Sequence, residues 1–219
     1  MSYEILEPLY NKIWVNAISK TKNENEILYS VCFYDDLLKY QSPDNFNKVH
    51  SIFFQLCNNY NTTNQDILQS VIWGFGELAR RLDRNGFAQY RDHVFNAINF
   101  LINKTDAFSE ENSFTSDNAI SSLTKFVLYQ CADNDMDALS RLLSLLPLKY
   151  DVTEGCEVMK LVFTHIIGKH PLLVNPGARE QLKGVFSRIQ DIRNKEGEFL
   201  DDQGLALYIQ ALNSIGLTI

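Results

Sequence analysis

The sequence predicts an all-α fold, an α-α superhelix of about five stacked helical hairpins. Apolar residues recur at steps of three and four through almost the whole chain, and strand-like alternation is almost absent. The 219 residues include only 10 glycines and 5 prolines, too few for a loop-rich β-sandwich or for a disordered chain. A new hairpin begins about every 40 residues, which indicates an internal repeat.

The stretch from 65 to 90 organises this prediction. Its first part reads as an amphipathic helix, with an apolar face formed by Ile67, Leu68, Val71, Ile72, Phe75, Leu78, Ala79 and Leu82. Gly74 and Gly76 each cost about 1 kcal/mol against alanine inside a helix, so with Ala79 they predict that another helix packs closely there. The polar run 83–86 predicts a turn with Gly86 as helix cap or turn residue, and a new apolar pattern begins at Phe87.

Three helices are expected before this stretch, at about 4–20, 26–40 and 44–60. The polar segment 21–25 separates the first two helices. Ser42 and Pro43 predict a sharp start of the third, with serine as N-cap and proline at the first helical position.

The helices expected after it cover about 87–103, 116–131 and 136–146. A polar link precedes the second of these, and Thr115 or Ser116 is expected to cap it. Asp151 and Glu154 resemble a capping box that opens a further helix to Ile167, where Gly168 predicts a stop. The last two helices are expected at about 176–191 and 199–213.

Pairing these helices gives one solenoid domain over 1–219, with repeats at about 4–41, 44–82, 87–131, 135–170 and 176–216. The starts are spaced by 40, 43, 48 and 41 residues, close to the repeat length of about 40–47 residues of HEAT-type helical hairpins. A lone hairpin cannot bury both faces, so neighbouring hairpins must stack. An irregular helical bundle is the alternative interpretation.

Composition narrows the classes of function. The net charge is −7, and 13 of the 27 acidic residues lie up to Glu110, so the acidity is spread along the chain. This disfavours nucleic acid and anionic membrane as partners, because both require a basic surface. The start of the chain does not resemble a signal peptide, and no apolar run is long enough for a transmembrane helix. The four cysteines are dispersed and are expected to be buried free thiols, at Cys32, Cys57, Cys131 and Cys156.

Several phrases, in collinear order over roughly 27–190, resemble the C-terminal part of an importin-β-type nuclear transport receptor, closest to the karyopherin-β3 branch. The phrases are Cys32 to Asp36 followed by Ser42-Pro43 and Phe46; Gln69 to Gly74 with Gly76, Ala79 and Tyr90; Asp117 to Ile120 with Lys125; and Leu145 to Leu148 followed by His170-Pro171. The sequence departs from the family pattern at Leu68 and Thr124, where the family has arginine and glycine.

This resemblance implies part of a nuclear import receptor that carries basic cargo proteins through the nuclear pore under Ran-GTPase control. It implies a non-enzymatic protein without a cofactor or metal, which shuttles between cytoplasm and nucleus. Family receptors are several times longer, so the resemblance also implies a C-terminal fragment whose contacts with Ran-GTPase and nucleoporins are made by the full-length protein. A HEAT-repeat scaffold for another protein complex is the alternative.

The resemblance also suggests which residues contact cargo. In such solenoids the second helix of each hairpin lines the concave surface, and carboxylates gathered there would attract lysine- and arginine-rich segments. The candidate cargo-binding residues are Asp35, Asp36, Glu77, Asp117, Asn118, Glu154 and Glu157. A purely structural role is the alternative for each: Asp117 and Glu154 would cap helices, and Asp35 and Asp36 would bridge neighbouring repeats.

Trp73 and Phe75 flank Gly74 and are candidates for a pocket that takes phenylalanine-glycine repeats of nucleoporins, with core packing as the alternative. No catalytic constellation is found, because the chain lacks a nucleophile elbow, a phosphate loop and an HExxH motif. His165 and His170 are five residues apart with Gly168 between them, so they are not expected to share a helix face or to bind a metal.

Overall fold

The computed structural model describes residues 20, 22–40, 47–196 and 199–217. This part of the chain is all-helical and contains no strand, which confirms the predicted all-α class. The expected first helix at 4–20 and the Ser42-Pro43 start lie outside the described residues. The helices are α3 (Glu24–Tyr40), α4 (Asn47–Asn58), α5 (Gln65–Arg81), α6 (Arg84–Phe87), α7 (Arg91–Ile102), α8 (Ser113–Gln130), α9 (Met136–Leu145), α10 (Val152–Ile167), α11 (Arg179–Glu196) and α12 (Asp202–Ser214), with a 3-10 turn η3 (Pro176–Ala178) before α11.

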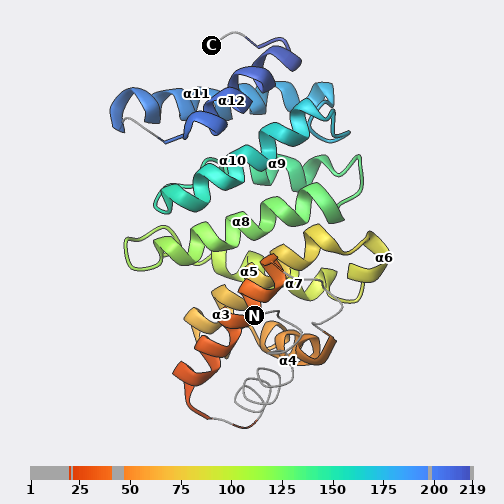
Figure 1. The fold of residues 1–219 in the computed structure, drawn as a ribbon, viewed down its shortest axis with the longest axis vertical. Coiled ribbons are helices and arrows are strands. Elements are labelled where there is room, and N and C mark those ends of the chain that lie inside the picture. The colour runs from red at the N-terminus through yellow and green to blue at the C-terminus, as the bar shows by residue number, and fades with distance from the viewer. Residues whose placement is uncertain (1–19, 21, 41–46, 197–198, 218–219) are drawn as a thin grey trace, which may run out of the picture.

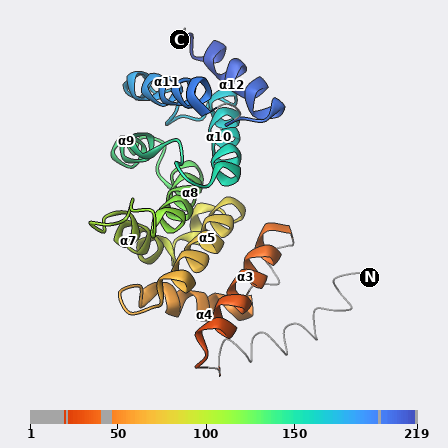
Figure 2. The same cartoon turned by 90° about the vertical axis from the view of Figure 1, so that its left-hand side faces the viewer.

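The helices are stacked in chain order along the long axis of the molecule, from α3 and α4 at one end to α11 and α12 at the other (Figure 1). The second helices of the predicted hairpins pack on one another in sequence: α5 on α3 and α8, and α10 on α8 and α12. The first helices lie beside them, with α7 against α4 and α11 against α9. Figure 2 shows α7, α9 and α11 along one side of the stack and α5, α10 and α12 along the other.

Helix α5 packs against α3, α4, α7 and α8, and its glycines explain how closely it approaches two of them. Asn64 caps its first turn by accepting a hydrogen bond from the Asp66 amide at 2.9 Å. A Cβ on Gly74 would overlap the Oδ1 atom of Asp35 on α3, and a Cβ on Gly76 would lie 3.0 Å from the Cα of Ser122 on α8. The small residues therefore let α5 approach α3 on one side and α8 on the other, which confirms the predicted close helix packing.

Several predicted helix ends differ from the structure. Helix α5 ends at Arg81, and Gly86 lies inside the short helix α6. Asp83 is the N-cap of α6 and accepts a hydrogen bond from the Gly86 amide. Helix α8 begins at Ser113, ahead of the predicted caps at Thr115 and Ser116. Ser116 instead donates its hydroxyl hydrogen to the Ala107 carbonyl, so its side chain holds the preceding loop against the helix.

Other predicted ends are confirmed. Helix α9 begins at Met136, and α10 ends at Ile167 with Gly168 as its C-cap. Asp151 caps α10 by accepting a hydrogen bond from the Glu154 amide at 2.9 Å. This bond is one of the two that a capping box contains. The other bond is absent, because the Asp151 amide donates to Asp117 and the Glu154 side chain pairs with Lys125.

One apolar core runs through the stack from Val31 on α3 to Ala211 on α12. Three of the four cysteines are buried free thiols, as predicted, whereas Cys32 is exposed. Burial raises the pKa of the Cys57 thiol to about 12. None of the described helices is both long and apolar enough to cross a membrane.

Candidate functional site

The candidate site is a charged cluster centred on Lys125, which lies on α8 in the row of second helices. The Lys125 Nζ atom lies 2.8 Å from Glu77 Oε1 on α5 and 3.2 Å from Glu154 Oε1 on α10. The side chains of Lys125 and Glu77 are only 5% and 3% exposed, so this pair is shielded from water. One ammonium group therefore joins three consecutive helices of the row.

The two carboxylates have further partners. Glu77 also pairs with Arg80 at 3.2 Å, and Glu154 accepts hydrogen bonds from Ser121 and from the Trp73 indole N–H. Burial acts to raise the pKa of Glu154, but Lys125, Ser121 and Trp73 together outweigh it and lower that pKa. Glu154 is therefore held as a carboxylate, and its Oε1 atom accepts all three of these contacts.

Trp73 lies between the cluster and α3. The ammonium groups of Lys39 and Lys125 lie 5.4 Å and 4.8 Å from the centroid of its ring, within the range of cation–π interactions. Trp73 is half-buried, while Phe75 is fully buried and packs against Phe53 and Tyr90. The position of Phe75 agrees with the core-packing alternative, and only Trp73 retains a partly exposed ring.

A pocket of about 230 Å³ opens beside the cluster, over α3, α5, α8, α10 and α12. Lys160 borders it and pairs with Glu157 at 2.8 Å and with Asp201 at 2.6 Å. Four cations and three carboxylates line the pocket: Lys39, Arg80, Lys125, Lys160, Glu77, Glu154 and Glu157. The predicted carboxylates Glu77, Glu154 and Glu157 are thus brought together, but lysine and arginine side chains accompany them, so the pocket is of mixed charge.

The adjacent pair Asp35 and Asp36 is split between interior and surface. Asp36 is exposed, whereas Asp35 is buried at the contact with Gly74, and its Oδ1 atom has no hydrogen-bond partner among the described residues. Burial raises the pKa of Asp35 well above its usual range, and the nearby charges of Asp36 and Glu77 raise it further, against the opposing effect of Lys125. These effects favour the neutral form of Asp35.

Asp117 is also buried, and three consecutive backbone amides satisfy its carboxylate. The amides of Lys149, Tyr150 and Asp151 donate to it at 3.3, 2.7 and 2.8 Å. Asp117 thus fixes the α9–α10 loop to α8, which agrees with a structural role, although not with the cap that the sequence suggested. Asn118 beside it is half-buried.

Sequence reasoning did not select the cations of the site. Lys125, Arg80, Lys39 and Lys160 were absent from the predicted set, which was chosen for negative charge. The available signal was Lys125 itself, because it is the only charged residue in the otherwise uncharged run 118–130 and its neighbours face the core. A charge at such a position requires a partner, and Glu77 and Glu154 supply it.

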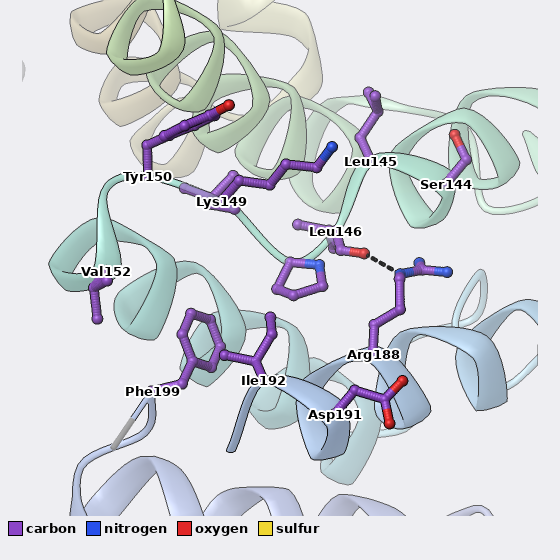
Figure 3. Close-up of a pocket in the computed structure, with 12 residues that line it drawn as sticks. Ser144, Leu145, Leu146, Lys149, Tyr150, Val152, Arg188, Asp191, Ile192 and Phe199 are labelled. Carbon is purple, nitrogen blue, oxygen red and sulfur yellow. Dashed lines mark hydrogen bonds between the residues drawn. The ribbon is translucent and has the colours of Figure 1, made fainter. Parts of the chain in front are cut away.

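A second, larger pocket of about 550 Å³ lies between the α9–α10 loop and α11. Figure 3 shows Arg188 and Ile192 on α11 facing the loop that carries Leu146 and Lys149, with Phe199 beside Ile192. The Arg188 guanidinium donates to the carbonyl oxygens of Leu146 at 2.8 Å and Leu143 at 2.6 Å. Arg188 is therefore engaged in holding the end of α9, and this pocket contains none of the predicted site residues.

Comparison with known proteins identifies no relative. No family model matches the chain, and no curated protein matches it. Among solved structures, a crystal structure of an engineered protein is similar over 98% of this chain and 99% of its own, with 13% sequence identity and a TM-score of 0.46. Likeness at this level supports no conclusion about family or function.

Proposed function

We propose that this chain is a protein-binding segment of a HEAT-type helical solenoid, part of an importin-β-type nuclear import receptor that carries basic cargo under Ran-GTPase control. The observation that supports the solenoid is the order of packing: each second helix contacts the next second helix, from α3 through α5, α8 and α10 to α12. Repeats that stack on their neighbours in this way build long surfaces for protein partners.

Only some of the candidate carboxylates are exposed and could contact a basic partner. Asp36 and Glu157 are exposed on the row of second helices, whereas Asp35, Glu77 and Asp117 are buried. Glu157 pairs with Lys160, but the Glu157 side chain is 60% exposed, so a cargo lysine can also reach its carboxylate from solvent. We therefore assign cargo contact to Asp36 and Glu157, together with the half-buried Asn118 and Glu154.

Variants of these two residues test this assignment. The double substitution Asp36→Asn and Glu157→Gln should weaken binding of a lysine- and arginine-rich peptide by about tenfold, which corresponds to about 1.4 kcal/mol. Asp92→Asn with Asp137→Asn removes the same charge from exposed positions on α7 and α9, in the other row, and serves as the matched control. Equal affinities of the two double variants, measured by fluorescence anisotropy, would rule out the assigned contacts.

A structural scaffold for another protein complex is the second candidate, and one observation favours it. The carboxylates of Glu77, Glu154 and Asp117 are all occupied by groups of the same chain that connect neighbouring helices. Such internal connections stiffen the stack without requiring a ligand. Failure of the folded chain to bind basic peptides at low salt would favour this candidate over the receptor.

A further inference from the structure

A third pocket, of about 580 Å³, opens at the end of the stack where α11 and α12 lie (Figure 1). The loop between α10 and η3, the start of α11 and the end of α12 line it. Both residues with a positive φ in the described part of the chain border this pocket, Lys169 at 57° and Gly216 at 61°. Glycine adopts this backbone conformation without a steric penalty, whereas lysine does not. The chain therefore keeps a lysine at the pocket where the backbone itself favours glycine or asparagine.

The two charged residues that line this pocket are both cations. They are Lys169 and Arg179, and no aspartate or glutamate lines the pocket. Neither cation forms an ion pair within the described ranges, although the whole chain has a net charge of −7. The Arg179 guanidinium is held in place by donating to the Gly216 carbonyl oxygen at 2.8 Å. Two cations without a carboxylate partner favour an anionic ligand at this place.

The other two pockets differ in this respect. Three carboxylates accompany the cations in the pocket beside Lys125. In the pocket between the α9–α10 loop and α11, Asp191 lies with Lys149 and Arg188, and Arg188 already donates to two carbonyl oxygens. Of these three pockets, only the one at the end of the stack has cations and no carboxylate in its lining.

The rest of the lining is suited to a ligand with an apolar body. Leu173 and Leu182 are buried in its wall, and Val174 is 42% exposed beside them. Polar side chains of α12 and of the loop before η3 complete the lining: Asn175, Asn213 and Ser214. A volume of about 580 Å³, apolar walls and a few polar groups are typical of small-molecule sites.

We propose that this pocket binds a small carboxylic acid with an aliphatic chain, of the medium-chain fatty acid class. Arg179 and Lys169 pair with the carboxylate, because charge-assisted hydrogen bonds from guanidinium and ammonium groups are the strong ones. The aliphatic chain lies along the apolar wall and removes the exposed part of Val174 from water. Both halves of the ligand are therefore required for binding.

Titration of the full chain with octanoate, followed by backbone amide signals in NMR spectra, tests the proposal. The amide signals of Lys169 and Gly216 should shift together along one saturation curve. Acetate keeps the carboxylate without the chain, and 1-octanol keeps the chain without the charge. Each of these two compounds should bind at least about tenfold more weakly than octanoate.

Variants of the two cations show whether the charges act as proposed. Lys169→Asn removes the charge and suits the left-handed backbone, and Arg179→Gln keeps an amide N–H for the Gly216 carbonyl. Each should weaken octanoate binding by about tenfold while the thermal transition stays close to that of the native chain. Lys183→Gln is the matched control, because Lys183 is exposed on α11 and does not line the pocket.

Three results would overturn the proposal. The first is an octanoate titration in which the amide signals of Lys169 and Gly216 do not move. The second is acetate or 1-octanol binding as tightly as octanoate. The third is a folded Lys169→Asn, Arg179→Gln double variant that binds octanoate as tightly as the Lys183→Gln control.

Discussion

At the scale of single residues, Lys125 connects three helices through one charged group. Its ammonium group is buried and satisfies carboxylates from α5 and α10, and its charge also lies over the Trp73 ring. A buried ion pair adds little net stability, but removal of one partner leaves an uncompensated charge in the interior. The chain therefore depends on Lys125 more than on any one of its surface charges.

Lys125→Met should lower the free energy of unfolding by about 3–5 kcal/mol, because it leaves Glu77 buried without its main partner. Urea denaturation followed by circular dichroism measures the loss. Lys160→Met is the matched control and should cost much less, because the partners of Lys160 are exposed. Equal losses for the two variants would show that the Lys125 cluster has no special structural role.

Asp35 gives a prediction about pH. Its pKa in the fold is well above 3.8, its ordinary value, so below pH 3.8 the carboxyl is neutral in both folded and unfolded chains. As pH rises, the unfolded chain releases this proton first, and the free energy of unfolding falls until the folded pKa is reached. An asparagine amide does not titrate, so the Asp35→Asn variant should gain stability relative to the native chain as pH rises above 3.8.

Urea denaturation of both proteins at several pH values measures that difference. Above the folded pKa of Asp35 the difference should become constant, and below pH 3.8 it should be smallest. A difference that does not change with pH would mean that Asp35 is ionised in the fold, contrary to its burial and to the lack of a partner for its Oδ1 atom among the described residues.

At the scale of elements, local sequence signals gave reliable positions where the cause was local. Helix α10 begins after Asp151 and ends before Gly168, as predicted, because a helix cap and a helix stop act within one turn. The early start of α8 was missed because Ser116 satisfies the distant Ala107 carbonyl, a tertiary contact without a local signature. The pairing of Glu154 with Lys125 was missed for the same reason.

The glycines of α5 and α11 provide a test at this scale. Gly76→Ala should destabilise the chain, because the new Cβ would lie 3.0 Å from the backbone of Ser122 on α8. Gly184→Ala on α11 should stabilise it by up to about 1 kcal/mol, because its Cβ would meet only the end of Arg188 at 3.5 Å. Thermal unfolding of the two variants should therefore give transition shifts of opposite sign, and an unchanged or raised transition for Gly76→Ala would contradict the close α5–α8 contact.

At the scale of the whole molecule, the second helices of the predicted hairpins pack on one another in chain order. The helical class followed from apolar periodicity, and the order of the elements followed from their spacing. The mixed charge of the candidate surface could not be predicted from the sequence, because the sequence shows which residues are charged but not which of them face one another. Glu77 and Asp117 were selected for their charge, and both are buried.

The central proposal is that this acidic helical stack binds basic proteins through its row of second helices. The most direct test is the affinity of the full chain for a lysine- and arginine-rich peptide across a salt series, with a glutamate-substituted peptide as control. The proposal predicts binding that weakens steadily as salt rises, and no binding of the control peptide. Absence of binding at low salt, or equal binding of both peptides, would contradict it.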